Sequence, residues 1–470
     1  MISKSFRHNL LIVSKIASAF FFFSIFFILL LNYSQYSKKI PVSYWDEMQW
    51  VGQSYLFQFY IQGNFDRKIW DTFNSLDQPT LAKFSYGAWL YPGYLSEKKL
   101  QGKKFDYTKY LISNGYYFVD ADLSEYRLYR ESLKQKVPEI KSEDTGFRED
   151  YLKKYGEKIN NTLNIIFYAR NINFVYLALA VLILTFFLSG QKGFFFSFLI
   201  VLLYGFNTLI VRNGVKAHSD ALFLLLFNTA LVLLFYYFLK KNMTYLILFS
   251  LFSGLAMSTK LNGIMLYFIF ILLYLSEYFP SFWGGAKQRL QNLRDLIIPI
   301  LIPLAVFIIL NPYTYSNPLQ KIRQMYDFRK KHTIHLSQYY PEVSLTTAGS
   351  TLIQIPKNFF SYKYFAGYNL PIFIKPVKYL GTLMLIFFLC GIYSEFLLFV
   401  KGNKFSYLIF SSFIYILLIM SFYLRLNWDR YFMHLVFFFI YYQVSGITFI
   451  LDFIKTFVNR HSDLTRIVEK

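Results

Sequence analysis

About ten long runs of apolar residues occupy most of this sequence, and they constrain the fold more than any other feature. The hydrocarbon core of a bilayer is ~30 Å thick, so a helix needs about 20 predominantly apolar residues to cross it. The runs lie at residues 9–31, 168–189, 194–211, 217–239, 243–258, 261–279, 296–310, 379–400, 405–424 and 431–454. We therefore predict an all-α polytopic membrane protein with about ten transmembrane helices.

The composition agrees with a membrane protein and excludes several other classes. Charged residues make up 16% of the chain and hydrophobic residues 55%, whereas about a quarter of a soluble domain is charged. The 49 Lys and Arg exceed the 27 Asp and Glu, which gives a net charge of +22. Because the basic residues mostly lie between apolar runs, we attribute them to membrane topology and not to nucleic-acid binding. Cys390 is the only cysteine, so the chain forms no internal disulfide.

Basic residues alternate between the gaps of the apolar runs and predict the orientation. The basic gaps contain Lys4, Arg7 and Lys15; Lys192; Lys240 and Lys241; Lys287, Arg289 and Arg294; Lys401 and Lys404; and Lys455, Arg460, Arg466 and Lys470. Cytoplasmic loops are enriched in Lys and Arg, so we expect both termini in the cytoplasm and the protein in the plasma or inner membrane. Two long polar loops, at residues 33–167 and 316–378, then lie on the extracytoplasmic side. We expect the first to carry interfacial helices.

The first of these loops contains acidic and basic residues close to the membrane exit. Asp46 and Glu47 follow the first apolar run and lie near the membrane exit, and an ionised carboxylate is unfavourable in lipid. Residues 77–83 read Asp-Gln-Pro-Thr-Leu-Ala-Lys, where Pro79 can be the first residue of a helix. Asp77 then precedes the positive end of that helix, and Lys83 follows about one turn later. Taken alone, an Asp-Glu pair at such a position is better explained as two solvated loop acids.

The order of several short motifs resembles the GT-C glycosyltransferases of family 39, which include protein O-mannosyltransferases and lipid A aminoarabinose transferases. The motifs are Trp-Asp-Glu at 45–47, Gly52, Gly-Asn-Phe at 63–65, the segment at 77–83, Ala-His-Ser-Asp-Ala-Leu at 217–222, the Gly-Leu-Ala and Thr-Lys pieces of 254–263, and Arg-Tyr at 430–431. The resemblance covers roughly residues 1–315 and is thin beyond them. Gln-Pro-Thr at 78–80 departs from the His-Pro-Pro or Lys-Pro-Pro of the family, and about ten spans are fewer than its members commonly have.

The resemblance implies a fold and a reaction. Residues 1–315 would form a GT-C catalytic transmembrane module, residues 316–378 a second outer loop, and residues 379–470 the last transmembrane helices with a short cytoplasmic tail. The enzyme would move a sugar from a polyprenyl-phosphate donor to a hydroxyl of a lipid, glycan or protein acceptor on the extracytoplasmic side. Asp46 would act as general base and the anomeric configuration would invert.

Each candidate residue has an expected role under this reading. Glu47 would either orient Asp46 or bind a metal. The oxygen ligands of Asp46, Glu47 and Asp77 would suit a divalent cation such as Mg²⁺ or Mn²⁺. The resemblance does not specify whether a metal cofactor is required. Three cations would bind the donor phosphate, namely Lys83, Lys260 and Arg430. Four residues would contact substrate, namely Asp77, Gln78, His218 and Asp220.

Other interpretations remain for these residues and for the chain. Lys260 could extend to the lipid head groups, Arg430 could pair with Asp429, and Asp220 could cap a helix. A lipid or sugar transporter, or flippase, is the main alternative function and would place charged residues within the spans. A non-catalytic membrane scaffold is a third possibility, and it would not require the acidic and basic residues to converge.

Overall fold

The computed structural model describes residues 4–115, 124–133, 148–156, 159–278, 286–360 and 380–468. Within them the regular structure is helical, and an isolated antiparallel bridge pairs Ser344 with Leu426. The predicted all-α fold class is therefore confirmed for the described part of the chain.

Seven helices among the described residues are long and apolar enough to cross a membrane, or eight if a bent pair counts as one span. The seven are α1 (Lys4–Ser37), α10 (Asn160–Lys192), α13 (Asp220–Lys240), α16 (Ala286–Leu310), α20 (Leu380–Val400), α21 (Lys404–Tyr423) and α22 (Met433–Val468). The bent pair is α11 (Phe194–Gly205) and α12 (Thr208–Gly214), which meet at 54°. The two remaining predicted spans are the shorter apolar helices α14 (Met243–Thr259) and α15 (Met265–Tyr278), the latter preceded by the short η4 (Leu261–Ile264).

Local side chains determine where several of these helices begin. Gly193 adopts φ +88 between α10 and α11, a conformation that favours glycine, and so permits a sharp reversal. Asn207 accepts hydrogen bonds from the backbone N–H groups of Leu209 and Ile210. This cap starts α12 anew and accounts for the bend after α11. Asn242 and Asn403 cap α14 and α21 in the same way.

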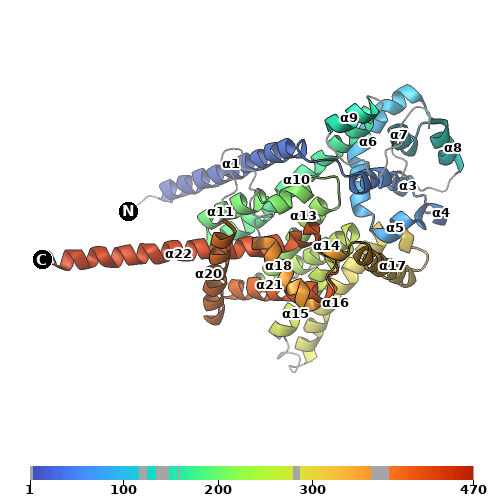
Figure 1. The fold of residues 1–470 in the computed structure, drawn as a ribbon. Helices are drawn as coiled ribbons and strands as arrows, with labels where there is room; N and C mark the ends of the chain where they lie inside the picture. The colour runs from blue at the N-terminus through green and yellow to red at the C-terminus, as the bar shows by residue number, and fades with distance from the viewer. Residues whose placement is uncertain are drawn as a thin grey trace.

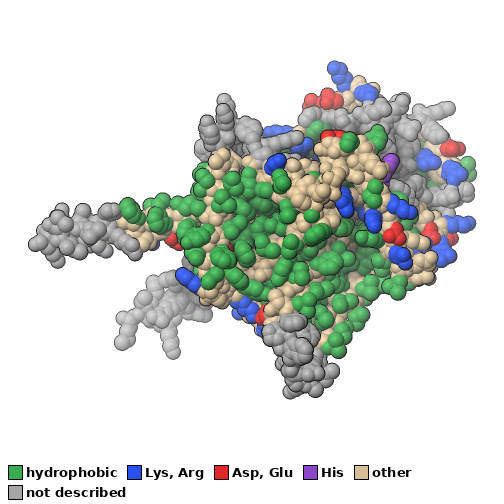
Figure 2. Space-filling view, turned by 60° about the horizontal axis from the view of Figure 1, so that its bottom comes forward, with side chains coloured by type: hydrophobic (Ala, Val, Ile, Leu, Met, Phe, Trp, Pro, Cys, Tyr) green, Lys and Arg blue, Asp and Glu red, His purple; other side chains and the backbone are tan. Residues whose placement is uncertain are grey.

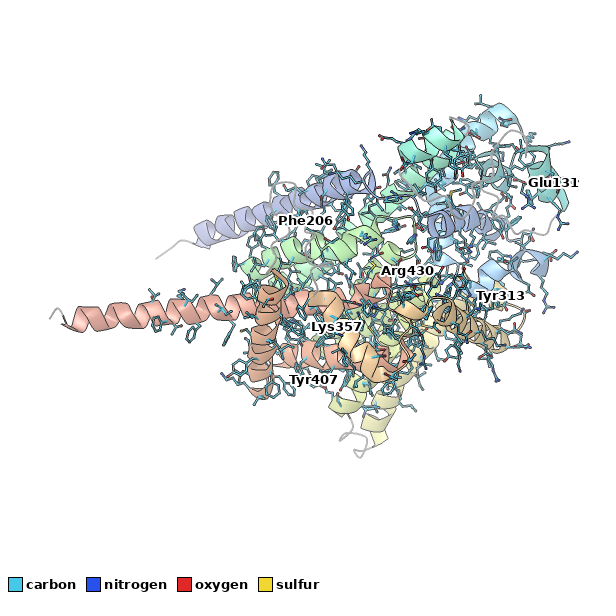
Figure 3. The ribbon with its side chains drawn as sticks, in the orientation of Figure 1. Glu131, Phe206, Tyr313, Lys357, Tyr407 and Arg430 are labelled. Carbon is cyan, nitrogen blue, oxygen red and sulfur yellow. The ribbon has the colours of Figure 1, made fainter. Side chains whose placement is uncertain are left out.

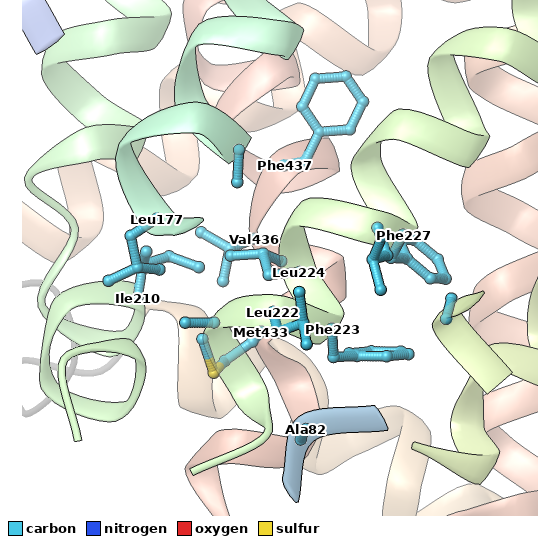
Figure 4. Close-up of a cluster of buried hydrophobic side chains, with 14 of the residues drawn as sticks. Ala82, Leu177, Ile210, Leu222, Phe223, Leu224, Phe227, Met433, Val436 and Phe437 are labelled. Carbon is cyan, nitrogen blue, oxygen red and sulfur yellow. The ribbon is translucent and has the colours of Figure 1, made fainter. Parts of the chain in front are cut away.

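Close helix contacts hold the bundle together. A Cβ atom on Gly391 of α20 would lie 1.7 Å from the carbonyl oxygen of Tyr442, and one on Gly446 of α22 would lie 1.8 Å from that of Phe387. The two glycines therefore permit the backbones of α20 and α22 to touch, as small residues do in membrane helix pairs. The cluster in Figure 4 joins α13, α22 and α12 and includes Ala82, which brings the first loop against the bundle.

The first long loop folds into a series of helices, most of them short. The sequence predicted interfacial helices in this loop but not where they begin and end. They are η1 (Tyr44–Met48), α2 (Gln49–Gly52), η2 (Gln53–Tyr55), α3 (Leu56–Ile61), α4 (Arg67–Trp70), α5 (Phe73–Asp77), α6 (Leu81–Gln101), α7 (Tyr107–Ser113), α8 (Ser124–Leu133) and α9 (Arg148–Tyr155). The second loop contains α17 (Pro318–Tyr339) and α18 (Ala348–Phe360), while residues 361–379 lie outside the described part.

The arrangement separates the two ends of the molecule. Figure 1 shows the first-loop helices and α17 at one end, and both chain termini at the other. Figure 2 shows a broad hydrophobic surface over the bundle, with Lys, Arg, Asp and Glu side chains gathered around the end with the loops. This is the surface expected of an integral membrane protein. We refer to the end with the loop helices as the loop end.

Candidate functional site

Residues from distant parts of the sequence meet where the loop helices join the transmembrane bundle. Asp46 lies in η1, just after α1, and Asp220 is the first residue of α13. Lys260 directly follows α14, and Arg430 lies in η8 (Asp429–Phe432), just before α22. Figure 3 shows Arg430 at this junction. Two acidic side chains and two basic side chains from separate elements therefore lie in one region.

Asp46 is the most accessible carboxylate of this group. Its Oδ2 lies 3.1 Å from Nη1 of Arg430 and 3.9 Å from Nε2 of His218, and its side chain is 39% exposed. Burial alone would raise the pKa of Asp46, but the adjacent guanidinium of Arg430 lowers it to about 2. Asp46 is therefore ionised at neutral pH and is a weak base as long as Arg430 stays beside it.

A second ion pair lies next to Asp46 and is almost completely buried. Nζ of Lys260 lies 2.6 Å from Oδ1 of Asp220. Nδ1 of His218 lies 3.6 Å from the other oxygen of Asp220, so His218 stands between Asp46 and Asp220. Lys260 therefore pairs with Asp220 instead of extending to lipid head groups. Asp220 was also considered as a helix cap, but in the structure its carboxylate forms this ion pair.

Glu47 occupies a different environment from its neighbour. Its side chain is fully buried and accepts hydrogen bonds at 2.6 Å from both Nε and Nη2 of Arg170. Backbone N–H groups of Ser43 and Ala217 donate to the same carboxylate at 2.9 and 2.8 Å. Burial would raise the pKa of Glu47, but Arg170 lowers it to about 2. Both oxygens are thus engaged in holding η1 against α10 and the start of α13, which is a structural role.

Arg170 was not identified as a candidate from the sequence. It lies in α10, is fully buried, and also donates to the carbonyl oxygens of Ser37, Ile40 and Pro41 at 2.7 to 3.3 Å. It therefore binds the end of α1 as well as Glu47. The available signal was an arginine inside a predicted apolar span, since charges there usually have a specific partner.

Asp77 and Gln78 lie on the side of the site formed by α5 and α17. Nη1 of Arg329 lies 2.7 Å from Asp77, and Nη2 of the same guanidinium is 3.3 Å from the hydroxyl of Tyr431. The backbone carbonyl of Gln78 accepts a hydrogen bond from Nζ of Lys83 at 2.9 Å. Arg329 was also missed, because its loop has no motif that predicts a role.

Tyr431 connects the two parts of the site. The Nζ of Lys260 lies 5.4 Å from its ring centroid, and the guanidinium carbon of Arg430 lies 5.7 Å from it. Three cations, Lys260, Arg430 and Arg329, therefore surround one aromatic side chain. The side chain of Asp429, the alternative partner of Arg430, lies outside the described residues.

Lys83 is a buried cation in α6. Its side chain is fully buried and its Nζ lies 5.8 Å from the ring centroid of Trp50. Burial lowers the pKa of Lys83 to about 7, while the negative charge of Asp77 acts in the opposite direction. Its charge is therefore sensitive to pH near neutrality.

The three carboxylates considered for a divalent cation do not form one oxygen cluster. Glu47 faces Arg170 and Asp77 faces Arg329, whereas Asp46 faces Arg430 and His218. Within the described residues, no three His, Cys, Asp or Glu side chains are grouped so that they could hold a metal ion. These side chains do not fit the predicted site of Asp46, Glu47 and Asp77.

A cavity of about 490 Å³ adjoins the cationic region. Its lining is mostly apolar and includes Met257, Leu304, Phe307, Ile322, Met325 and Phe422. Arg329 and Tyr431 also line it, so one part of the wall belongs to the polar site. Its wall also carries other polar and charged groups, among them Lys330 and Arg425. A largely apolar cavity of this size with several polar groups is typical of a small-molecule or lipid site.

Comparison of the chain with protein-family models, with curated proteins and with solved structures finds no match.

Proposed function

We propose that this protein is a membrane glycosyltransferase that moves a sugar from a polyprenyl-phosphate donor to an acceptor hydroxyl. One observation carries the proposal: residues of four motifs that are widely separated in the sequence come together around Asp46. Arg430 contacts Asp46, and His218 lies between Asp46 and the Asp220–Lys260 pair. A membrane scaffold would not require that convergence.

The cavity beside the site supports a lipid-linked donor. Its apolar lining would accommodate part of an isoprenoid chain, and Arg329 and Tyr431 would lie near the phosphate end. Arg430 and Lys260 add positive charge next to Tyr431. Fixed positive charge stabilises the phosphate that leaves as the glycosidic bond breaks. Lys83, Gln78 and Asp77 would lie at the margin of this donor site.

Asp46 is the proposed general base. In the described state Arg430 holds its pKa at about 2, which makes it a weak base. A donor phosphate that attracts Arg430 would weaken this ion pair and make Asp46 more basic. Asp46 would then take the proton of an acceptor hydroxyl that attacks the anomeric carbon, and a single displacement inverts configuration. Donor binding would thus activate the base.

The proposed site is on the extracytoplasmic side, with both termini in the cytoplasm. The loop helices and the two termini lie at opposite ends of the molecule, as this orientation requires. Single cysteines in a Cys390→Ser background test it with a membrane-impermeant maleimide on intact cells. We expect labelling of Lys103→Cys at the loop end, and labelling of Lys401→Cys only after permeabilisation. The reverse pattern would contradict the orientation.

The decisive experiment gives purified protein a panel of polyprenyl-phosphate sugars with candidate acceptors and follows the products by mass spectrometry. We expect one donor to be consumed and Asp46→Asn to reduce transfer about a hundredfold or more. Asp66→Asn is the matched control, because Asp66 caps α4 in the same loop and asparagine caps helices equally well. Full transfer by Asp46→Asn would refute the assignment. Movement of an intact donor across proteoliposomes, without transfer, would favour the transporter alternative.

A further inference from the structure

His218 is a buried side chain whose ring nitrogens are unsatisfied. The residue is 3% exposed, and neither Nδ1 nor Nε2 has a hydrogen-bond partner within the described part of the chain. Buried polar atoms without a partner are uncommon and require an explanation. Its position is fixed by the backbone, because the hydroxyl of Tyr86 donates to its carbonyl oxygen at 2.6 Å.

The ring lies between two carboxylates, just beyond hydrogen-bond distance from each. Nε2 is 3.9 Å from Oδ2 of Asp46, and Nδ1 is 3.6 Å from Oδ2 of Asp220. A shift of about 1 Å would bring Nε2 into the ordinary hydrogen-bond range of about 2.7–3.2 Å. The charged groups around this arrangement are Arg430, which faces Asp46; Lys260, which faces Asp220; the fully buried Glu47; and Lys216, two residues before His218.

The exposures of the two residues argue against direct contact between His218 and a substrate. The Asp46 side chain is 39% exposed and the His218 side chain 4%. A substrate that reaches this region meets Asp46 first, and the imidazole lies behind it. The sequence-based expectation that His218 binds substrate therefore fits the geometry less well than a role through Asp46.

We propose that His218 receives the proton that Asp46 removes from the acceptor, which deepens, and rests on, the function proposed above. The acceptor O–H bond breaks as its oxygen forms a bond to the anomeric carbon. The bond from that carbon to the donor phosphate breaks, and its electron pair leaves with the phosphate. The proton passes to the carboxylate of Asp46 and then to Nε2 of His218. Asp220 stabilises the resulting imidazolium from the Nδ1 side.

This relay has two requirements. The resting imidazole carries its proton on Nδ1, towards Asp220, so that Nε2 has a free lone pair. The ring must also be neutral before each turnover, because a protonated imidazole accepts no proton. Transfer should therefore slow under acidic conditions that protonate the ring. His218 is thus a positioning and proton-accepting residue that acts through Asp46.

The test is the pH dependence of kcat for the unmodified protein and for His218→Gln. We expect kcat of the unmodified protein to fall on the acidic side of its pH profile, which we call the acidic limb. In His218→Gln we expect kcat to fall about tenfold or more, donor KM to change less than twofold, and the acidic limb to disappear. His434→Gln is the matched control, since His434 is a second buried histidine that contacts the sulfur of Met420. It should keep the acidic limb.

Two outcomes would overturn the relay. One is an unmodified protein without an acidic limb, which can be measured even if the variants fail to fold. The other is a His218→Gln protein that keeps both its kcat and its acidic limb. Loss of transfer in Asp46→Asn alongside either result would leave the proposed function intact, whereas full transfer in Asp46→Asn would remove the basis of both.

Discussion

Arg430 and Asp46 are 384 positions apart in the sequence, yet Nη1 of one lies 3.1 Å from Oδ2 of the other. The contact joins η1, which follows the first transmembrane helix, to η8, which precedes the last. It keeps the Asp46 carboxylate ionised and places a guanidinium beside it, where a donor phosphate would compete for the same cation. The two proposed roles, base and phosphate ligand, are therefore coupled.

Removal of the Arg430 guanidinium should weaken donor binding. For Arg430→Gln we expect donor KM to rise about tenfold or more, because a charged hydrogen bond contributes about 1.5–3 kcal/mol. Arg430→Lys should recover part of this loss, since it keeps the charge but not the planar fork. Initial rates at varied donor concentration measure both variants. An unchanged donor KM in Arg430→Gln would contradict a role of Arg430 in binding the donor phosphate and would leave its ion pair with Asp46.

Glu47 should matter for stability more than for chemistry. Glu47→Gln leaves the buried guanidinium of Arg170 without its counter-charge, and breaking such a pair is destabilising by about 3–5 kcal/mol. Thermal unfolding in detergent should show this loss, with Glu97→Gln on α6 as a partly exposed control. The pKa of Glu47 is lowered from 4.5 to about 2, so its stabilisation is complete above pH 4.5 and is lost as the pH falls towards 2. A stable but inactive Glu47→Gln would instead indicate a catalytic role.

Single and double variants of Lys260 and Asp220 can separate the contribution of this ion pair to stability from its contribution to donor binding. Either Lys260→Met or Asp220→Asn alone leaves one buried charge unpaired, so each should destabilise the protein by about 3–5 kcal/mol. The double variant removes both charges and should recover most of the stability. If Lys260 contacts the donor phosphate, donor KM stays raised in the stable double variant. A double variant with normal donor KM would mean that Lys260 serves only Asp220.

Lys83 predicts a pH dependence of donor binding. Its pKa, lowered by burial to about 7, means that the ammonium loses its charge as the pH rises through neutrality. If this charge holds the donor phosphate, donor KM should rise about tenfold between pH 6 and 8. Lys83→Met should show a high donor KM at every pH in this range. A donor KM that is flat across the range in the unmodified protein would contradict a role of the Lys83 charge in binding the donor phosphate.

Stability should rise with pH at Lys83, in the same sense as at Glu47 but over a higher pH interval. The unfolded chain keeps this lysine protonated up to its ordinary pKa of 10.5, whereas the folded protein releases the proton near 7. The unfolded state then binds more protons, so the contribution of Lys83 to folding becomes more favourable as the pH rises from 7 to 10.5. Comparison of unfolding in the unmodified protein and Lys83→Met isolates this contribution.

Hydrophobic patterning alone was enough to predict an all-α membrane protein and the approximate positions of its helices. Hydrophobic length is a local property, so each predicted run corresponds to a helix or a bent pair. Two of the runs, 243–258 and 261–279, form the shorter apolar helices α14 and α15. The reversal at Gly193 and the bend at Asn207 depend on single residues whose conformational preferences act locally.

The partner of each charged side chain depends on the folded arrangement of the helices. Asp46 and Glu47 are neighbours with the same charge, but one is partly exposed beside Arg430 and the other is buried against Arg170. Arg170 and Arg329 had no motif to identify them, and their partners, Glu47 and Asp77, are 123 and 252 positions away. A pattern in the sequence reports hydrophobicity and local geometry, whereas an ion pair depends on which distant groups the folded helices bring within a few ångströms.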